Sequence, residues 1–265
     1  MLKSMYSGVA GMRGFQTKLD VIGNNIANVN TVGFKKSTVM FKDLLSQNMG
    51  GDSVNTTQVG LGSSISSINT IHTSGSPITT GNKTDLSFQG EGYFVVGSGD
   101  NEYLTRSAAF QIQVEEDDAG NTSGKLVTTE GQEVLAIPVG GTVDEAGVPI
   151  DDISKIVSID GNGILTYVSS DTEEVTTVQL KTGTVQNASG LEKIGGSLYR
   201  LTGKSGGLQD IPEASRIISG QLEMSNVDLT EEFTEMILAQ RGFQANSRVI
   251  TTSDEMLQEI VNLKR

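Results

Sequence analysis

The chain has 265 residues, no cysteine, one histidine and a formal charge of -13. The missing cysteines exclude disulfides, thiolate nucleophiles and Cys-ligated zinc, and a Ser/His/Asp triad could run only through His72. The negative charge argues against nucleic acid or an anionic membrane as partner, because both require a cationic surface. Hydrophobic residues make up 36% of the chain, which favours thin or elongated domains over one thick core.

The N-terminal segment predicts one long helix. Apolar residues recur at spacings of three and four from Leu2 to Ile26, and the Asn-rich segment 28–33 supplies stop signals, with Gly33 as a candidate C-cap. Interior glycines each cost up to about 1 kcal/mol relative to alanine, so this helix needs partners that bury its stripe. These glycines are Gly8, Gly11, Gly14 and Gly23. The segment has no continuous apolar region of the kind that a cleavable signal peptide requires.

The middle of the chain differs in composition. Residues 46–81 are rich in Ser, Thr, Asn and Gly and are interpreted as a linker or irregular extended chain. From about 85 to 199, short β-prone runs alternate with turn signals, which predicts an all-β domain, a sandwich or an open barrel. The predicted strands are 93–96, 102–105, 110–114, 133–137, 164–168 and 176–180, with turns at 99–101, 118–121 and 160–163.

The C-terminal segment predicts a second long helix. Asp228 is a candidate N-cap with Glu231 three residues later, which is a capping arrangement. A 3–4 spacing continues through Phe233, Met236, Gln240, Phe243, Ser247, Ile250, Asp254, Leu257 and Val261. Residues 1–45 carry a net charge of +4 and residues 220–265 one of -4, so the two ends can pair.

Candidate catalytic and metal motifs are weak. Gly203-Lys204-Ser205 lacks the first glycine and the strand–loop–helix frame of a phosphate loop, so a turn is favoured. The acidic segments 117–121 and 160–162 lack the alternating ligands and terminal Glu of a calcium loop. We therefore expect no catalytic residues, no metal and no cofactor. A carbohydrate-binding β module and a hydrolase acting through His72 remain the competing classes.

Two long motifs resemble those of bacterial flagellar rod and hook proteins. The first is Leu19-Asp20-Val21-Ile22-Gly23-Asn24-Asn25-Ile26-Ala27-Asn28-Val29-Asn30-Thr31-Val32-Gly33-Phe34-Lys35. The second begins at Ser225-Asn226-Val227-Asp228-Leu229 and continues through Met236-Ile237, Ala239-Gln240-Arg241 and Phe243-Gln244-Ala245-Asn246 to Val261-Asn262-Leu263. Segments 85–94 and 103–110 resemble the start of the family's β domain.

The resemblance implies an elongated α+β fold with paired, coiled-coil-like terminal helices, a central all-β domain and an extended linker layer. Residues 1–33 with 222–265 would form a helical inner tube. Residues 34–80 with 205–221 would form the connecting region, and residues 81–204 the outer β domain. The implied subunit is not an enzyme, does not insert into membranes, and leaves the cell through the flagellar type III export apparatus without signal cleavage.

The hook is the favoured role, as a flexible tube that transmits torque from rod to filament and encloses the export channel. Gly23-Asn24-Asn25, the ending Asn262-Leu263 and the compact length resemble hook proteins. The alternative is the distal rod protein of the basal body, because the segment between Phe41 and Val59 is intermediate in length. Implied partners are further copies in a helical homopolymer, the distal rod protein, the hook cap, the hook–filament junction protein and the export apparatus.

The residues that we expect at the assembly interface come from the two terminal motifs. They are Leu19, Ile22, Asn24, Asn25, Ile26, Asn28, Thr31, Gly33 and Phe34 in the first motif. In the second they are Asn226, Val227, Asp228, Leu229, Phe233, Met236, Gln240, Arg241, Phe243, Gln244, Asn246, Leu257, Val261 and Leu263.

Overall fold

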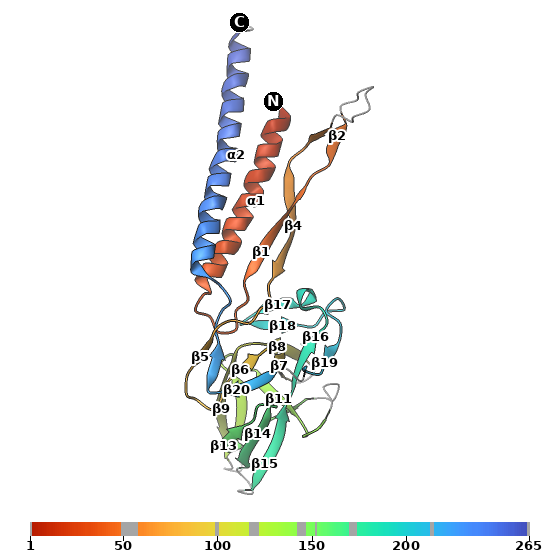
Figure 1. The fold of residues 1–265 in the computed structure, drawn as a ribbon, viewed down its shortest axis with the longest axis vertical. Coiled ribbons are helices and arrows are strands. Elements are labelled where there is room, and N and C mark those ends of the chain that lie inside the picture. Colours follow the sequence, from red (N-terminus) through yellow and green to blue (C-terminus); the bar gives the residue numbers. More distant parts are fainter. Residues whose placement is uncertain are drawn as a thin grey trace. The chain divides into compact units, whose positions relative to one another are not determined.

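The computed structural model describes residues 2–48, 58–98, 101–116, 122–141, 147–151, 153–169, 174–212 and 215–263 (Figure 1). Its contacts divide the chain into two compact units. The helical unit comprises Met1–Val29, Lys36–Ile71 and Val227–Arg265, and the β unit comprises Asn30–Lys35 and His72–Asn226. The chain therefore crosses between the units at four points: after Val29, Lys35, Ile71 and Asn226.

The helical unit contains the two predicted long helices, α1 (Leu2–Ala27) and α2 (Leu229–Leu263), which lie side by side in Figure 1. Lys18 of α1 pairs with Glu235 near the start of α2, whereas Gly8 lies against Ile250 further along it. Because residue numbers run in opposite directions along the contact, the helices are antiparallel. Coiled-coil geometry between them stays a prediction.

A two-stranded ribbon completes the helical unit. Strand β1 (Ser37–Asp43) pairs antiparallel with β4 (Ser63–Thr70), with a bulge between Met40 and Phe41, and β2 (Ser46–Asn48) pairs with β3 (Gln58–Gly60). The interpretation of residues 46–81 as irregular chain was therefore wrong for β2, β3, β4 and β5 (Pro77–Thr79). Ser- and Thr-rich sequence carries little apolar alternation, but two such strands can satisfy each other's backbone groups.

The β unit is an assembly of short antiparallel strands. Six of them match the predicted runs: β7 (Tyr93–Ser98), β8 (Asn101–Thr105), β9 (Ala108–Glu116), β11 (Glu133–Ile137), β14 (Ile164–Ser169) and β15 (Val175–Leu180). The sequence pattern did not single out β6 (Asp85–Gln89), β10 (Thr122–Thr128), β12 (Val148–Pro149), β13 (Ile153–Ile159), β16 (Thr182–Val185), η1 (Ala188–Gly190), β17 (Glu192–Gly195), β18 (Leu198–Arg200), β19 (Leu208–Gln209), β20 (Arg216–Ser219) or β21 (Gln221–Glu223).

The main sheet joins its strands in the order β17, β18, β8, β7, β11, β10, β9, β6 and β20, with further strands attached beside this path. Its core lies on both faces of β7, because successive side chains of a strand point to opposite sides. Phe94 and Val96 belong to one buried apolar cluster, and Tyr93 and Val95 belong to a second.

Two further predictions concern the connecting segments. The turn at 160–163 is present, because the Gly163 N–H donates to the Asp160 carbonyl at 2.9 Å. The predicted turns at 99–101 and 118–121 fall mostly or wholly outside the described residues. Residues 205–221, predicted as connecting chain, carry β19 and β20, which pair with β16 and β6. The assignment of chain segments to tube layers stays a prediction.

Candidate assembly interface

Three glycines of α1, Gly8, Gly11 and Gly14, lie on the side that packs on its neighbours. A Cβ added to Gly8 would lie 3.4 Å from Ile250, and one added to Gly11 would lie 2.9 Å from the amide of Asn246. In return, a Cβ on Gly242 of α2 would come within 2.6 Å of the Phe15 ring. Glycine therefore allows close approach of the two helices, which offsets its low helix propensity.

Asn25 joins three elements of the helical unit. Its amide Nδ2 donates to the Ser37 carbonyl at 2.9 Å and to Glu232 at 3.1 Å, and its Oδ1 accepts from the Ser37 N–H at 3.0 Å. Asn25 and Glu232 are both buried. By contrast, the Asn28 amide donates to the Asn24 carbonyl at 2.9 Å, which is local capping of α1. The Asn-rich stop thus combines one tertiary contact with ordinary helix termination.

The start of α2 has the predicted cap. Asp228 Oδ1 accepts from the backbone N–H of Thr230 at 2.8 Å and of Glu231 at 3.4 Å. Glu231 in turn pairs with Lys36 at 2.7 Å, and Glu235 pairs with Lys18. The predicted attraction between basic N-terminal and acidic C-terminal residues is therefore present locally. These pairs are partly exposed, so each contributes at most about 1 kcal/mol.

The residues of the first motif divide by burial. Ile22, Asn25, Gly33 and Phe34 are buried, and Leu19, Ile26 and Asn28 are half-buried, whereas Asn24 and Thr31 are exposed. In the second motif, the half-buried residues are Asn226, Val227, Met236, Asn246 and Leu257. The exposed ones are Asp228, Leu229, Phe233, Gln240, Arg241, Phe243, Gln244, Val261 and Leu263.

The face of α2 that contacts α1 matches the predicted stripe only in part: Met236, Ser247, Ile250 and Leu257 are half-buried, but other stripe residues are not. The most buried residues of the helix are Glu232, Ala239 and Ser253. Phe233, Gln240 and Asp254, each one position later, are exposed instead. Small residues allow the helices to approach closely, so packing selected a face that is less hydrophobic than the predicted one. The sequence signal that could have found it is the run of small residues Ala239, Gly242 and Ser253.

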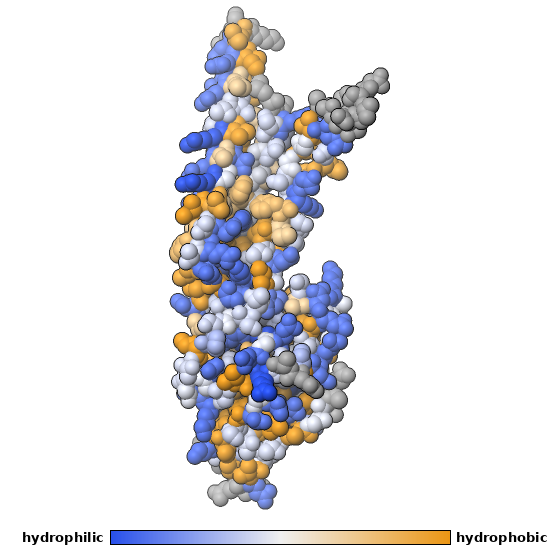
Figure 2. Space-filling model, in the orientation of Figure 1, coloured by the Kyte–Doolittle hydropathy of each residue, from blue (hydrophilic) through white to orange (hydrophobic). Residues whose placement is uncertain are grey.

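Two apolar stripes remain exposed on α2, on either side of its buried face. Helical residues repeat at 3.6 per turn, so Leu229, Phe233 and Ile237 form one stripe. Leu238, Val249, Met256, Ile260 and Leu263 form the other. Exposed apolar side chains are visible along the helices in Figure 2. Residues 258–263 are exposed on all sides. A helix that is apolar on several faces requires more than one packing partner.

His72 has a packing role in the β unit. Its Nδ1 lies 2.8 Å from the Tyr93 hydroxyl, and its ring contacts Tyr199 with centroids 5.4 Å apart. Burial lowers the pKa of His72 to about 4, and the positive charges of Lys35 and Arg106 act in the same direction. An imidazole with so low a pKa is a weak base, and its packing against two tyrosines fits a structural role.

Metal sites, membrane-spanning helices and the phosphate-loop motif can be checked in the part of the chain that the structure describes. Within the described ranges, no three His, Cys, Asp or Glu side chains gather as a metal site requires. Among the described helices, none is long and apolar enough to cross a membrane. Gly203-Lys204-Ser205 forms a turn, in which Ser205 Oγ donates to the Thr202 carbonyl at 2.7 Å.

Both ends of the chain match models of known protein families. Residues 5–35 match the family described as flagella basal body rod protein. Residues 218–263 match the family described as flagellar basal body rod FlgEFG protein, C-terminal. The first match covers α1 from residue 5 and the chain beyond it, and the second covers α2 with the segment before it.

Full-length relatives separate into rod and hook proteins. The flagellar basal-body rod protein FlgG of Bacillus subtilis is 47% identical to this chain, with 100% of each chain aligned over 278 positions. The protein of the same name from Agrobacterium fabrum is 34% identical, covering 96% of this chain and 97% of its own. The flagellar hook protein FlgE of Borreliella burgdorferi is 27% identical over 441 positions, with 100% of each chain covered. Similarity and length both agree better with the rod proteins.

Proposed function

We propose that this chain, which belongs to the flagellar rod and hook protein family, is the distal rod protein of the flagellar basal body. The observation that carries the proposal is the 47% identity to a rod protein over all of both chains. The hook was the favoured interpretation from sequence, partly because the chain is compact. The hook relative from Borreliella burgdorferi aligns over 441 positions against 265 residues here, so compact length supports the rod.

The exposed faces of α2 support a role as the subunit of a helical polymer. Two apolar stripes on different sides of one helix require two different neighbours. When unlike surfaces of identical subunits bind each other, each subunit is rotated relative to the one before it. Unless these rotations add up to one full turn and close a ring, the subunits continue as an open helical assembly, here a tube. In this proposal further copies of the chain cover Phe233 on one side and Leu263 on the other. The predicted interface residues on α2 that are exposed, such as Phe233 and Val261, remain available for such contacts.

The role is structural, without a catalytic step or cofactor. Export through the flagellar type III apparatus without signal cleavage and location in the flagellum remain part of the proposal. Of the predicted partners, further copies of the chain fit a rod subunit. The hook cap and the hook–filament junction protein were inferred for a hook subunit and are not carried over.

Complementation separates the rod from the hook. The gene would be expressed in two Bacillus subtilis strains, one lacking its rod protein FlgG and one lacking its hook protein. We expect hooks and swimming to return only in the strain that lacks FlgG. Rescue of the hook-deficient strain alone would overturn the proposal. Electron microscopy of polymerised protein gives a second measurement, in which straight tubes are expected and curved tubes would contradict the rod.

A matched pair of variants tests the interface. Val261 on α2 is 64% exposed, and Val175 on β15 of the β unit is 65% exposed. Val261→Ser should prevent or slow polymerisation while leaving the fold intact, because it removes an apolar contact to a neighbour. Val175→Ser makes the same chemical change at equal exposure and should polymerise normally. Equal behaviour of the two variants would count against an interface along α2.

A further inference from the structure

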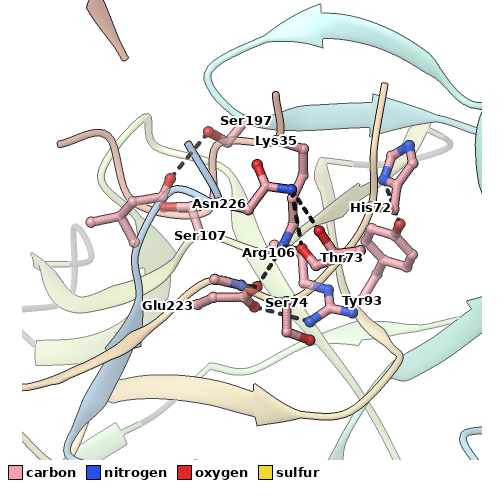
Figure 3. A network of polar contacts seen from close by, with 12 residues as sticks. Lys35, His72, Thr73, Ser74, Tyr93, Arg106, Ser107, Ser197, Glu223 and Asn226 are labelled. Atoms are coloured by element: carbon pink, nitrogen blue, oxygen red, sulfur yellow. Dashed lines mark hydrogen bonds and ion pairs between the residues drawn. The ribbon is translucent and has the colours of Figure 1, made fainter. Parts of the chain in front are cut away.

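Three of the four crossings between the units begin or end beside one buried group of charges in the β unit. Lys35 is the last residue of the first β-unit segment, and Thr73 follows the crossing after Ile71. Glu223 lies three residues before the crossing after Asn226. Arg106 comes from the chain between β8 and β9. Figure 3 shows these side chains directed toward one another.

Glu223 is the centre of this group, which we call the charge cluster (Lys35, Arg106 and Glu223). One carboxylate oxygen accepts from Lys35 Nζ and from the Gly75 N–H at 2.8 Å, and the other accepts from Arg106 Nη1 at 2.9 Å. Lys35 Nζ also donates to the Thr73 carbonyl at 2.7 Å. All three charged side chains are at most 2% exposed.

Backbone contacts bring the same three segments together. The Gly33 N–H donates to the Glu223 carbonyl at 2.8 Å, and the Met224 N–H donates to the Ser76 carbonyl at 3.0 Å. A Cβ on Gly75 would lie 1.9 Å from the Met224 carbonyl oxygen, so only glycine permits this approach. Asn226 Nδ2 adds a bond to Thr73 Oγ1 at 3.0 Å.

The charges of the cluster make it unfavourable to separate one segment while the others stay in place. Burial alone would raise the pKa of Glu223, but the charges of Arg106 and Lys35 outweigh this and hold the pKa below its usual value. Burial lowers the pKa of Lys35, and the adjacent Glu223 carboxylate opposes that change. Moving the segment of Lys35 or of Glu223 away would leave an uncompensated charge in the interior, and moving 72–76 away would remove a hydrogen-bond partner from both charges, which is strongly unfavourable.

We propose that the charge cluster is a single lock that holds the 30–35, 72–76 and 222–226 segments together, so that the three open in one step. The lock follows from the geometry of the β unit alone. Its mechanical consequence rests on the proposed rod function: a twisting load between the units passes through the crossings, and a lock at their β-unit ends shares that load among them. The alternative is that each segment is held separately by its own neighbours.

Native-state hydrogen exchange of the purified full chain tests the lock without requiring polymerisation. The amides of Gly33, Gly75 and Met224 each report on one segment. In the wild type we expect these amides to share one opening equilibrium and one dependence on added denaturant. Different denaturant dependences for the three amides would overturn the single lock. Because no rod is needed, failure of the rod proposal and failure of the lock are distinguishable.

Variants of the charge cluster provide the second arm. Glu223→Gln keeps the shape of the side chain but leaves Lys35 and Arg106 without a counter-charge, so exchange of all three amides should rise at least about tenfold together. Glu192→Gln removes the carboxylate of an exposed ion pair with Arg200 and should change none of them. If Glu223→Gln does not fold, Lys35→Met still removes one cluster member and should raise exchange of the same three amides. An increase confined to one segment in either variant would refute the proposal.

Discussion

Gly242 of α2 and Gly23 of α1 are helical glycines whose replacement by alanine should act in opposite directions. A Cβ on Gly242 would lie 2.6, 2.8 and 2.9 Å from three atoms of the Phe15 ring. The ring has a further neighbour in Phe41, with centroids 5.8 Å apart, which restricts its movement. A Cβ on Gly23 would meet no atom within 4 Å among its surroundings.

The magnitude follows from two opposing effects. Alanine gains up to about 1 kcal/mol over glycine within a helix, and near the end of α1 the gain for Gly23→Ala should be about 0.5 kcal/mol. Overpacking against a held ring costs about 1–3 kcal/mol. Gly242→Ala should therefore lower the free energy of unfolding by about 1 kcal/mol, whereas Gly23→Ala should raise it.

Urea unfolding followed by circular dichroism at 222 nm measures both changes in the same helical unit. In a Phe15→Leu background the ring is absent, so Gly242→Ala should lose most of its cost and couple to Phe15→Leu by about 1 kcal/mol. If Gly242→Ala stabilises the chain as much as Gly23→Ala does, Phe15 does not pack on Gly242 and the described contact between α1 and α2 is refuted.

Three more substitutions test polar contacts in the two units. The usual pKa of histidine is 6.5 and that of His72 is about 4, so the unfolded chain binds the proton first and stability falls as the pH decreases from 6.5 toward 4. After allowance for partial exposure, wild type should lose about 1 kcal/mol more than His72→Phe between pH 7 and pH 5, measured by urea unfolding; equal losses would contradict the buried neutral imidazole. Asn25→Ala should cost about 2–3 kcal/mol because the buried Glu232 and the half-buried backbone of Ser37 lose their partner, and Asn28→Ala at the helix end less than about 1 kcal/mol. Equal thermal unfolding of these two asparagine variants would show that Asn25 makes no tertiary contact of consequence.

Features that depend on neighbouring residues in the chain were predictable. The Asp228 cap needs only the next three residues, and β11 was predicted with its observed limits because an apolar run between turns favours a strand locally. Weakly patterned strands such as β4 were missed, because their stability comes from a partner strand and not from their own sequence.

The helix pairing shows where local reasoning fails for the candidate interface. The 3–4 spacing predicted two long helices correctly, and the opposite charges of the ends predicted that they attract. The spacing also placed Phe233 and Gln240 on the main stripe. Both are exposed, whereas the preceding residues Glu232 and Ala239 are buried, so the inward face follows the predicted stripe only at other positions such as Ile250. Hydrophobicity indicates which faces of a helix must be buried but does not decide which neighbouring element buries them. Close approach of two helix backbones depends on the residues of both helices.

By itself, the sequence determined the two terminal helices, six of the central strands, the capping of α2 and the membership of a flagellar family, because periodicity, caps and long motifs are properties of contiguous residues. Only the tertiary structure decided that α1 and α2 meet through glycine and alanine, and that Asn25 bonds to Ser37 and Glu232. It also decided that Lys35, Arg106 and Glu223 share one buried site. Those contacts join residues far apart in the chain, such as Asn25 and Glu232, which are 207 positions apart, and no local pattern records such a contact. Burial then gives these distant charges and amides their importance, because each must find its partner within the fold.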